Sequence, residues 1–291
     1  MFGNRRVRVT ANTVLMILTL FCLIPFLLIV ISSVTDETTL IRDGYSFLPN
    51  KFGLDSYLYL WNHSSAILRA YGITVLVAVV GTSMSMLFTM FMAYPLSVPD
   101  LPHRKILSFF VYFTMLFNGG VVPTYIIWTR VLGLKNTIWA LIFPYLLVRA
   151  FYVLMMRSYF TNNIPQSILE SARIDGAKEF YIFFRIVIPI SLPMVASLGL
   201  LIGLGYWNDW INGLYFITDS KLFSIQNLLN RMLKEIQFLA SGAGSTEGMG
   251  MLPSVGIRMA IAVIGVLPIM VIYPFIQRYL VKGMVMGAIK G

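Results

Sequence analysis

The stretch ILESARIDGA occupies residues 168–177 and lies between two long apolar runs of the chain. It contains Glu170, Arg173 and Asp175 and ends beside Gly176. Ionised side chains are costly inside hydrocarbon and are rare there. Whether this segment is a surface helix of a soluble protein or a loop of a membrane protein depends on what the flanking runs are.

The composition predicts an integral membrane protein. Of 291 residues, 58% are hydrophobic and 12% are charged, and the mean hydropathy is +0.79. A soluble domain carries about 25% charged residues, because its surface needs charge to stay dispersed. The net charge of +10 fits Lys and Arg gathered in cytoplasmic loops, and we expect no nucleic-acid partner. Cys22, His63 and His103 stand apart, so we expect no metal site.

Six apolar runs are long enough to cross a bilayer, which takes about 20 helical residues. They are expected to be helices, since lipid cannot satisfy backbone polar groups and the runs lack the alternation of a barrel. The sequence therefore predicts an all-α membrane protein with one transmembrane domain over residues 1–291. The expected spans are residues 12–34, 70–95, 106–128, 137–158, 183–207 and 257–281.

The distribution of basic residues predicts the orientation. Six spans place both termini on one side of the membrane, together with the loops at 96–105 and 149–185. That side carries 13 of the 22 Lys and Arg residues, counting Arg278 near the end of the last span, and 4 of the 12 acidic residues. Cytoplasmic loops are enriched in Lys and Arg, so both termini are predicted to be cytoplasmic. ILESARIDGA then belongs to a cytoplasmic segment, residues 167–185, between spans four and five.

The local pattern of this segment predicts a short helix over residues 167–175. Ser167 and Glu170 have the spacing of a capping box, in which each side chain bonds the other residue's backbone N–H. Pro165 suits the start of a helix and Gly176 a left-handed end. On this reading alone, Glu170 and Arg173 would form a solvated i,i+3 pair on a surface helix.

A wider pattern connects the segment to a known family. From Glu170 the chain reads E-S-A-x-x-D-G, then nine residues, then Ile186-Val187-Ile188-Pro189. This resembles the EAA motif of ABC-importer permeases, with Ser171 in place of Ala and Ile188 in place of Leu. LFNGGVVPTY at 116–125, LGLKNTIWALIFP at 132–144 and YLVKGMVMGAIKG at 279–291 also resemble the carbohydrate-importer (MalG/LplC-like) branch.

The resemblance implies that the segment is a coupling helix that docks on a separate ATP-hydrolysing subunit. It implies that Glu170 faces polar or basic groups of that subunit, that Ala172 permits close approach, and that Gly176 turns the chain. The sequence has no G-x-x-x-x-G-K-[ST] phosphate loop. ATP and Mg are therefore expected on the partner, with no cofactor on this chain. The expected coupling residues are Glu170, Ser171, Ala172, Asp175 and Gly176.

The C-terminal tail and the partners are also inferred from the resemblance. Lys282, Lys290 and Gly291 are expected to reach the ATPase dimer, although a basic tail attracted to anionic lipid is an equal alternative. The expected assembly in the bacterial plasma (inner) membrane has a second homologous permease, two copies of the ATP-binding subunit and an extracellular or periplasmic solute-binding protein.

Polar and aromatic residues inside or beside the spans are candidates for the substrate path. Sugars combine apolar faces, which stack on aromatic rings, with hydroxyls that need hydrogen-bond partners. Such residues also serve as interfacial anchors or helix-packing positions, and this alternative stays open. The candidates are Asn118, Tyr206, Trp207, Asn208 and Asp209.

The longest external loop, residues 211–256, contains apolar residues at helical spacing. This predicts an amphipathic helix lying at the membrane interface. The glycine-rich stretch 241–250 follows it and is either a contact for the binding protein or a plain connector. The residues that define the helical spacing are Leu228, Leu229, Met232, Leu233, Ile236 and Leu239.

Together these features predict a permease subunit that carries an oligosaccharide, or a related sugar or polyol, by alternating access and performs no covalent chemistry. The main alternative is an ion-coupled secondary transporter, which would need midplane acids or broken helices and an internal repeat. No convincing example is visible in the sequence. An intramembrane enzyme would need a catalytic cluster at depth, and the predicted spans contain none.

Overall fold

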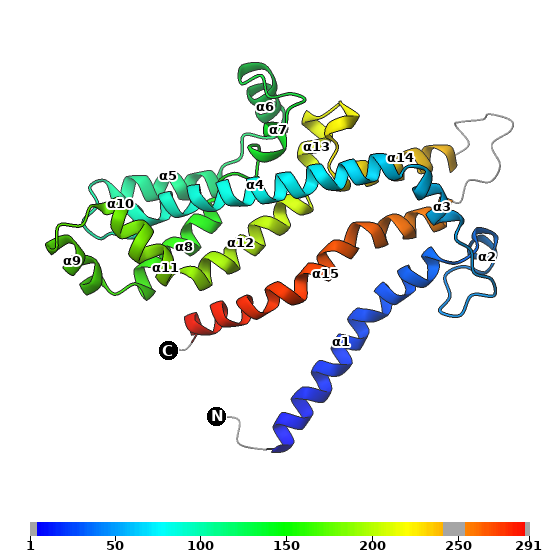
Figure 1. Cartoon of the computed structure of the whole chain (residues 1–291), viewed down its shortest axis with the longest axis horizontal. Helices are drawn as coiled ribbons and strands as arrows, with labels where there is room; N and C mark the ends of the chain where they lie inside the picture. Colours follow the sequence, from blue (N-terminus) through cyan, green and yellow to red (C-terminus); the bar gives the residue numbers. More distant parts are fainter. Residues whose placement is uncertain (1–4, 241–253, 289–291) are drawn as a thin grey trace. The chain divides into compact units, whose positions relative to one another are not determined.

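The structure is a computed structural model that describes residues 5–240 and 254–288, and its regular secondary structure in this part is helical apart from one isolated bridge between Thr35 and Phe52. Figure 1 shows the elements with their labels. The helices in chain order are α1 (Arg5–Ser33), α2 (Glu37–Asp43), α3 (Asp55–Asn62), α4 (Ser64–Ser97), α5 (Arg104–Leu116), α6 (Val121–Ile126), η1 (Ile127–Val131), α7 (Trp139–Ile142), α8 (Ala150–Asn163), α9 (Gln166–Ile174), α10 (Glu179–Ile182), η2 (Phe183–Val187), α11 (Ile188–Ile190), α12 (Leu192–Trp207), α13 (Ile211–Phe216), η3 (Ser220–Leu222), α14 (Ile225–Ala240) and α15 (Ser254–Ala288).

The chain forms two compact units. Unit 1 comprises residues 1–67 and 229–270, and unit 2 comprises residues 68–228 and 271–291. This division does not test the prediction of a single transmembrane domain over residues 1–291, which remains a prediction. The coupling segment belongs to unit 2.

Unit 1 is anchored by a buried carboxylate. Glu37 opens α2, is 8% exposed, and accepts hydrogen bonds from the backbone N–H groups of Val255 and Gly256 at 2.9 and 2.8 Å. These two donors belong to the first turn of α15, whose N–H groups have no partner inside the helix. The carboxylate also complements the positive end of the helix dipole. The start of the last long helix is thereby fixed to α2.

The amphipathic helix predicted in the loop 211–256 is confirmed as α14. Leu229, Met232 and Ile236 on its apolar face are between 4% and 7% exposed. This face is buried within the protein, whereas we predicted that it would lie at the membrane interface. Helical spacing of apolar residues shows that a face will be covered, but it does not say whether lipid or protein covers it. Residues 241–250 lie outside the described part of the chain.

The predicted spans differ in continuity. In the described residues α1 and α4 are long and apolar enough to cross a membrane, and the count rises to four if each of two bent pairs is one span. The first pair bends by 108° between α5 and residues Val121–Val131, and the second by 82° at Ser191. The six-span topology and the side on which the termini lie therefore remain predictions.

Local sequence accounts for both breaks. Gly120 has a φ of 89°, a left-handed value that glycine adopts without steric cost, and it separates α5 from α6. The second break lies between Pro189 and Pro193, which cannot donate backbone hydrogen bonds. The predicted span 137–158 is likewise divided into α7 and α8, with Pro144 between them. We predicted unbroken helices because length and hydropathy alone do not locate such breaks.

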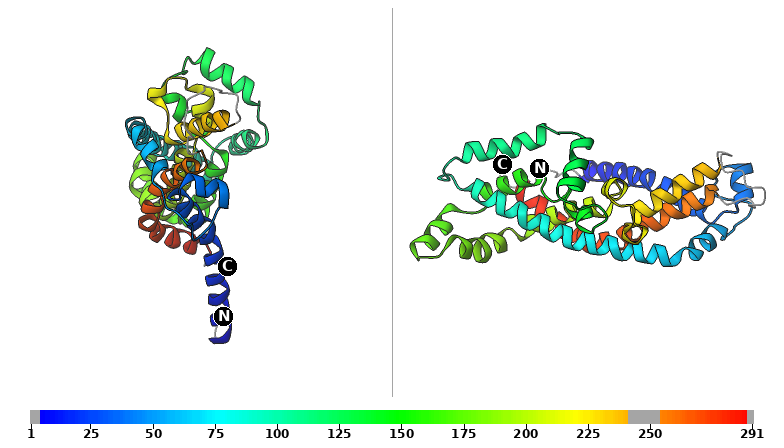
Figure 2. Two further views of the ribbon diagram at one scale, coloured as in Figure 1. Left: turned by 90° about the vertical axis from the view of Figure 1, so that its right-hand side faces the viewer. Right: turned by 90° about the horizontal axis from the view of Figure 1, so that it is seen from above.

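Within unit 2, α9 lies at one end of the helices, whereas α6, α7 and α13 gather away from it; both Figure 1 and the view from above in Figure 2 show this separation. We call residues 121–142 and 211–219 the cap. Between α9 and the cap, α4, α8 and α12 contribute half of a buried apolar core. Its fully buried members include Ala93, Leu141, Val153, Met156, Val187 and Leu198.

Candidate coupling site

The coupling segment begins at Pro165, which occupies the N-cap position of α9 with φ −63° and ψ 125°. No side chain caps the helix, so the predicted capping box between Ser167 and Glu170 is wrong. The proline ring fixes the φ of the N-cap residue, and the helix begins at Gln166, one residue before Ser167. Ser167 therefore lies inside the first turn instead of in front of it.

The end of α9 has the geometry of a Schellman motif. The Ala177 N–H donates to the Ala172 carbonyl, and the Gly176 N–H donates to the Arg173 carbonyl, both at 3.0 Å. Gly176 has a φ of 81°, and this pair of bonds satisfies carbonyls that the helix leaves free. The predicted left-handed stop at Gly176 is confirmed. It turns the chain sharply from α9 into α10.

One face of α9 is fixed to the protein, and the other is exposed. Leu169 is 5% exposed and belongs to the apolar core of unit 2, with Ala172 packed against that core. Glu170, Ser171 and Asp175 are exposed. Between them Ile174 is 86% exposed, although burying such a side chain is worth about 1.5–3 kcal/mol. A single exposed apolar side chain is common on protein surfaces, so Ile174 adds to the exposed polar face of α9 without marking an interface by itself.

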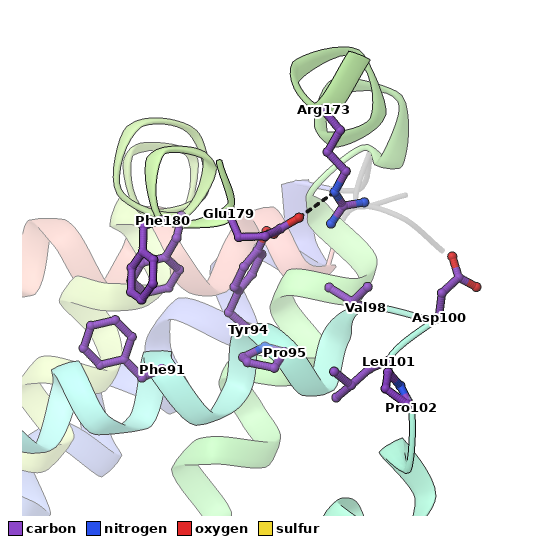
Figure 3. Close-up of a pocket in the computed structure, with 11 residues that line it drawn as sticks. Phe91, Tyr94, Pro95, Val98, Asp100, Leu101, Pro102, Arg173, Glu179 and Phe180 are labelled. Atoms are coloured by element: carbon purple, nitrogen blue, oxygen red, sulfur yellow. Dashed lines mark hydrogen bonds and ion pairs between the residues drawn. The ribbon is translucent and has the colours of Figure 1, made fainter. Parts of the chain in front are cut away.

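The opposite edge of the helix is held by a shared carboxylate, drawn in Figure 3. Arg173 Nε donates to Glu179 Oε1 at 2.8 Å, and the Tyr94 hydroxyl donates to Glu179 Oε2 at 2.7 Å. The predicted Glu170–Arg173 pair is therefore wrong, because Arg173 binds Glu179 on α10 instead. This leaves the Glu170 carboxylate unpaired in the described part of the chain. The bond to Glu179 raises the pKa of Arg173, so its charge is kept.

The Arg173–Glu179–Tyr94 network joins three elements: α9, α10 and the end of α4. It borders an open groove of about 460 Å³ that is otherwise mainly apolar. Phe183 of η2 stacks on Phe91 of α4 with ring centroids 5.2 Å apart, and it lies 5.3 Å from the ring of Tyr94. Figure 3 shows that Phe91, Tyr94 and Pro95 line the side of the groove formed by α4. The ion pair and the Tyr94 hydrogen bond thus connect α9, α10 and α4, and the ring contacts connect η2 to α4.

Sequence reasoning missed Ile174, Glu179 and Tyr94. Ile174 could have been found, because it is the apolar residue on the polar side of ILESARIDGA when the segment is drawn as a helix. Glu179 and Tyr94 lie 85 residues apart in sequence, so only the three-dimensional fold brings them together. Among the described residues no group of three or more His, Cys, Asp or Glu could hold a metal ion.

Of the candidate substrate-path residues, Tyr206 and Trp207 are buried. The Tyr206 side chain is 2% exposed, and its hydroxyl donates to the Ile142 carbonyl at 3.0 Å. Its ring lies so close to Gly81 on α4 that a side chain there would clash. Trp207 is 8% exposed and lies 6.4 Å, centroid to centroid, from Tyr71. In this conformation both rings help to pack unit 2.

The other path candidates lie at helix ends. Asn208 is the exposed C-cap of α12, and Asp209 Oδ1 accepts from the N–H groups of Ile211 and Asn212 at the start of α13. Asn118 is exposed in the break before α6, where its Oδ1 accepts from the Gly120 N–H at 2.9 Å. The substrate roles of these residues stay predictions.

The predicted tail contacts cannot be compared with a described geometry. Lys290 and Gly291 lie outside the described residues, and Lys282 is placed only as part of the backbone of α15. Their predicted contact with an ATPase stays a prediction.

Comparison with known proteins adds an independent line of evidence. Residues 70–286 match the family described as binding-protein-dependent transport system inner membrane components. The chain is 37% identical over 269 residues to protein LplC of Bacillus subtilis, covering 92% of this chain and 90% of that protein. It is also 37% identical over 281 residues to the polygalacturonan/rhamnogalacturonan transport system permease protein YtcP of the same organism, covering 95% and 96%.

A solved structure shows the same similarity. The chain resembles a subunit of a bacterial ABC transporter involved in the import of the acidic polysaccharide alginate. The TM-score is 0.77 and the sequence identity is 25%, over 96% of this chain and 99% of that one. The similarity therefore extends over nearly the whole chain.

Proposed function

The chain belongs to the family of binding-protein-dependent transport system inner membrane components, and from this premise we propose that it is a permease subunit of an ATP-driven importer of oligosaccharides. Membership of this family favours the importer over the ion-coupled secondary transporter, although the helices are broken as such a transporter's can be. The chain is a multi-pass protein of the inner membrane. We assign it no enzymatic activity of its own.

The observation that supports this function most directly is the exposed face of α9. Glu170, Ser171, Ile174 and Asp175 present charge, a hydroxyl and an apolar side chain side by side on a helix whose other face is anchored by Leu169. Protein interfaces combine an apolar centre with a polar rim in this way. We assign this face to an ATP-hydrolysing partner, because the chain has no phosphate loop of its own.

The structure suggests how force would reach the membrane helices. A partner that closes on ATP binding would displace α9, and the Schellman turn at Gly176 makes α9 and α10 move together. The Glu179 carboxylate would then transmit the displacement to Tyr94 on α4. Alternating access would follow as a rigid-body change between two discrete arrangements of the helices. ATP and Mg would be held and used on the partner alone.

The full importer would contain further chains. The family name indicates a binding protein, and we propose in addition a second homologous permease and two copies of the ATPase. The lipid bilayer surrounds the permease pair. We propose an oligosaccharide cargo because YtcP is named for transport of polygalacturonan and rhamnogalacturonan.

Co-purification tests the coupling assignment. The double variant Glu170→Ala, Gly176→Pro removes a charge of the exposed face and imposes a negative φ where the chain needs 81°. We expect the variant to insert into the membrane normally and to lose the co-expressed ATPase. A variant that still purifies with a stoichiometric ATPase would show that α9 does not dock there.

The control is Glu235→Ala, which removes a charge of the same sign from another helix. Glu235 is exposed on α14, far in sequence from the coupling segment. Its loss should leave ATPase attachment unchanged. Transport assays with a panel of oligosaccharides and the binding protein would then identify the cargo.

A further inference from the structure

A second groove in unit 2 combines basic side chains with exposed rings. It lies where α5 packs against α8 and has a volume of about 1020 Å³. The residues that line it come from the loop before α5, from α5 and from α8. They are Pro99, Leu101, His103, Arg104, Lys105, Ile106, Ser108, Phe109, Tyr112 and Arg157.

The polar end of this groove is cationic. Arg104 and Lys105 open α5, Arg157 enters from α8, and no acidic residue lines the groove. The three ion pairs of the described residues involve none of these cations. The first turn of α5 adds the positive end of a helix dipole. The groove therefore concentrates positive charge, and no carboxylate of the described residues forms an ion pair with these cations.

Two of the cations are held in position. Arg104 Nε donates to the Leu96 carbonyl at 2.9 Å, and Arg157 Nη1 donates to Ser108 Oγ at 3.3 Å. Each guanidinium has further N–H groups for an anion beyond the one it uses here. Lys105 is exposed and can reach the same space. A phosphate, with its several acceptor oxygens, matches such a set of donors.

The other end of the groove is apolar and faces outward. Ile106, Phe109 and Tyr112 follow the basic residues along α5 and are 56%, 60% and 47% exposed. The change from charge to apolar side chains coincides with the start of the predicted span 106–128. This order, a cationic head site followed along a helix by apolar side chains, matches the order of groups in a phospholipid.

We propose that this groove binds an anionic phospholipid, with its phosphate among Arg104, Lys105 and Arg157 and an acyl chain along Ile106, Phe109 and Tyr112. A soluble phosphate would use only the basic end, and a zwitterionic lipid would bring its own cation into a cationic site. The site is independent of the coupling helix and of the nature of the cargo. It requires only that the chain lies in a bilayer.

Native mass spectrometry of the purified, delipidated permease complex tests this site. Dioleoyl phosphatidylglycerol is titrated in detergent against the wild type, against Lys105→Gln and against Lys105→Gln, Arg157→Gln. Each basic residue near a membrane surface is worth about fivefold in affinity, so the double variant should bind roughly 30-fold more weakly. Lys105→Arg keeps the charge and should keep the affinity.

The control is Arg130→Gln, Lys135→Gln, which removes the same charge from two exposed residues outside the groove. It should bind the lipid as the wild type does. If the control loses as much affinity for the lipid as the groove variant does, the loss comes from the net charge of the protein, and the proposed site is overturned. Equal binding of dioleoyl phosphatidylcholine, or no saturable binding, would do the same. Displacement of the lipid by millimolar inorganic phosphate would assign the groove to free phosphate and refute the lipid.

Discussion

The coupling segment and the cap of unit 2 use polar residues in opposite ways. In the coupling segment, Arg173 alone is tied inward, and Glu170, Ser171 and Asp175 remain exposed. In the cap, the Asn136 side chain is hydrogen-bonded within the protein. Its Oδ1 accepts from the N–H groups of Thr218 and Asp219 at 2.6 and 3.2 Å. One region leaves its polar side chains exposed, and the other uses them to close a loop.

The aromatic residues show the same contrast. In the cap, Tyr125 stacks on Phe216 with centroids 6.0 Å apart, and Trp139 stacks on Phe143 at 5.2 Å. Beside α9, the rings of Phe180 and Tyr181 are 72% and 58% exposed. Exposed apolar residues do not by themselves distinguish the two regions, since Val122 and Val131 of the cap are 68% and 72% exposed. The difference lies in the polar side chains, which are exposed on α9 and hydrogen-bonded within the cap at Asn136.

The largest expected effect comes from Ile174→Asp, which attacks the centre of the exposed face. Desolvating a carboxylate at an interface centre, together with the loss of an apolar anchor, costs about 2 kcal/mol or more. We expect the affinity for the ATPase to fall at least 30-fold, measured by titrating purified ATPase onto the permease in nanodiscs.

The matched control for this substitution is Leu48→Asp. Leu48 and Ile174 are similarly exposed, at 88% and 86%. Leu48 lies in unit 1, in the loop after α2. Its substitution should leave ATPase binding unchanged. Equal weakening by both substitutions would remove the distinction between the coupling face and any other exposed apolar residue.

A smaller and different effect is expected in the cap from Asn136→Ala. The substitution removes the bonds to residues 218–219, and alanine fits the left-handed φ of 56° less well than asparagine does. Net losses of about 1 kcal/mol per hydrogen bond imply destabilisation of about 2 kcal/mol. The melting temperature in detergent should fall by several degrees while ATPase attachment is kept.

Asn162→Ala is the control for the cap, since Asn162 is exposed and its side-chain Nδ2 donates to Ser158 Oγ at 3.3 Å. It should melt close to the wild type. Loss of ATPase attachment in Asn136→Ala would mean that the cap and the coupling segment are not separate in function.

The smallest effect is expected from Tyr94→Phe. This substitution tests whether a displacement of α9 reaches α4, and it leaves the proposed docking face unchanged. Only the hydroxyl that bonds Glu179 is lost, a change of about 1 kcal/mol. We expect ATPase attachment to persist and binding-protein-stimulated ATP hydrolysis to fall about fivefold. Tyr159→Phe is the control. Equal hydrolysis in Tyr94→Phe and wild type would exclude the network from coupling.

Sequence predicted the class of protein, the place of the short helix and its left-handed end at Gly176, because hydropathy and glycine chemistry are local properties. The capping box failed because Pro165 set the start of α9 by its ring alone. The breaks at Gly120 and Ser191 were missed because an apolar run satisfies the length criterion whether it is straight or bent. Continuity depends on tertiary contacts that can support a bend.

The candidate site was only half predictable. Glu170, Ser171 and Asp175 follow from the motif, and the structure leaves all three exposed. Tyr206 was chosen as a ring beside polar residues, yet it is buried with its hydroxyl bonded to the Ile142 carbonyl. The pairing of Arg173 with Glu179 was not predictable from the helix alone. Glu170 is closer to Arg173 in sequence, whereas Glu179 comes near Arg173 only because the chain turns after α9.

Protection of a single cysteine tests the central claim that the outer face of α9 docks on an ATPase. Cys22, the one cysteine of the chain, is replaced by Ser, and Ser171→Cys or Leu48→Cys is added. A water-soluble maleimide should label both variants in the permease alone. Adding the ATPase should protect Ser171→Cys and leave Leu48→Cys labelled. Equal labelling of Ser171→Cys with and without a bound ATPase would contradict the account.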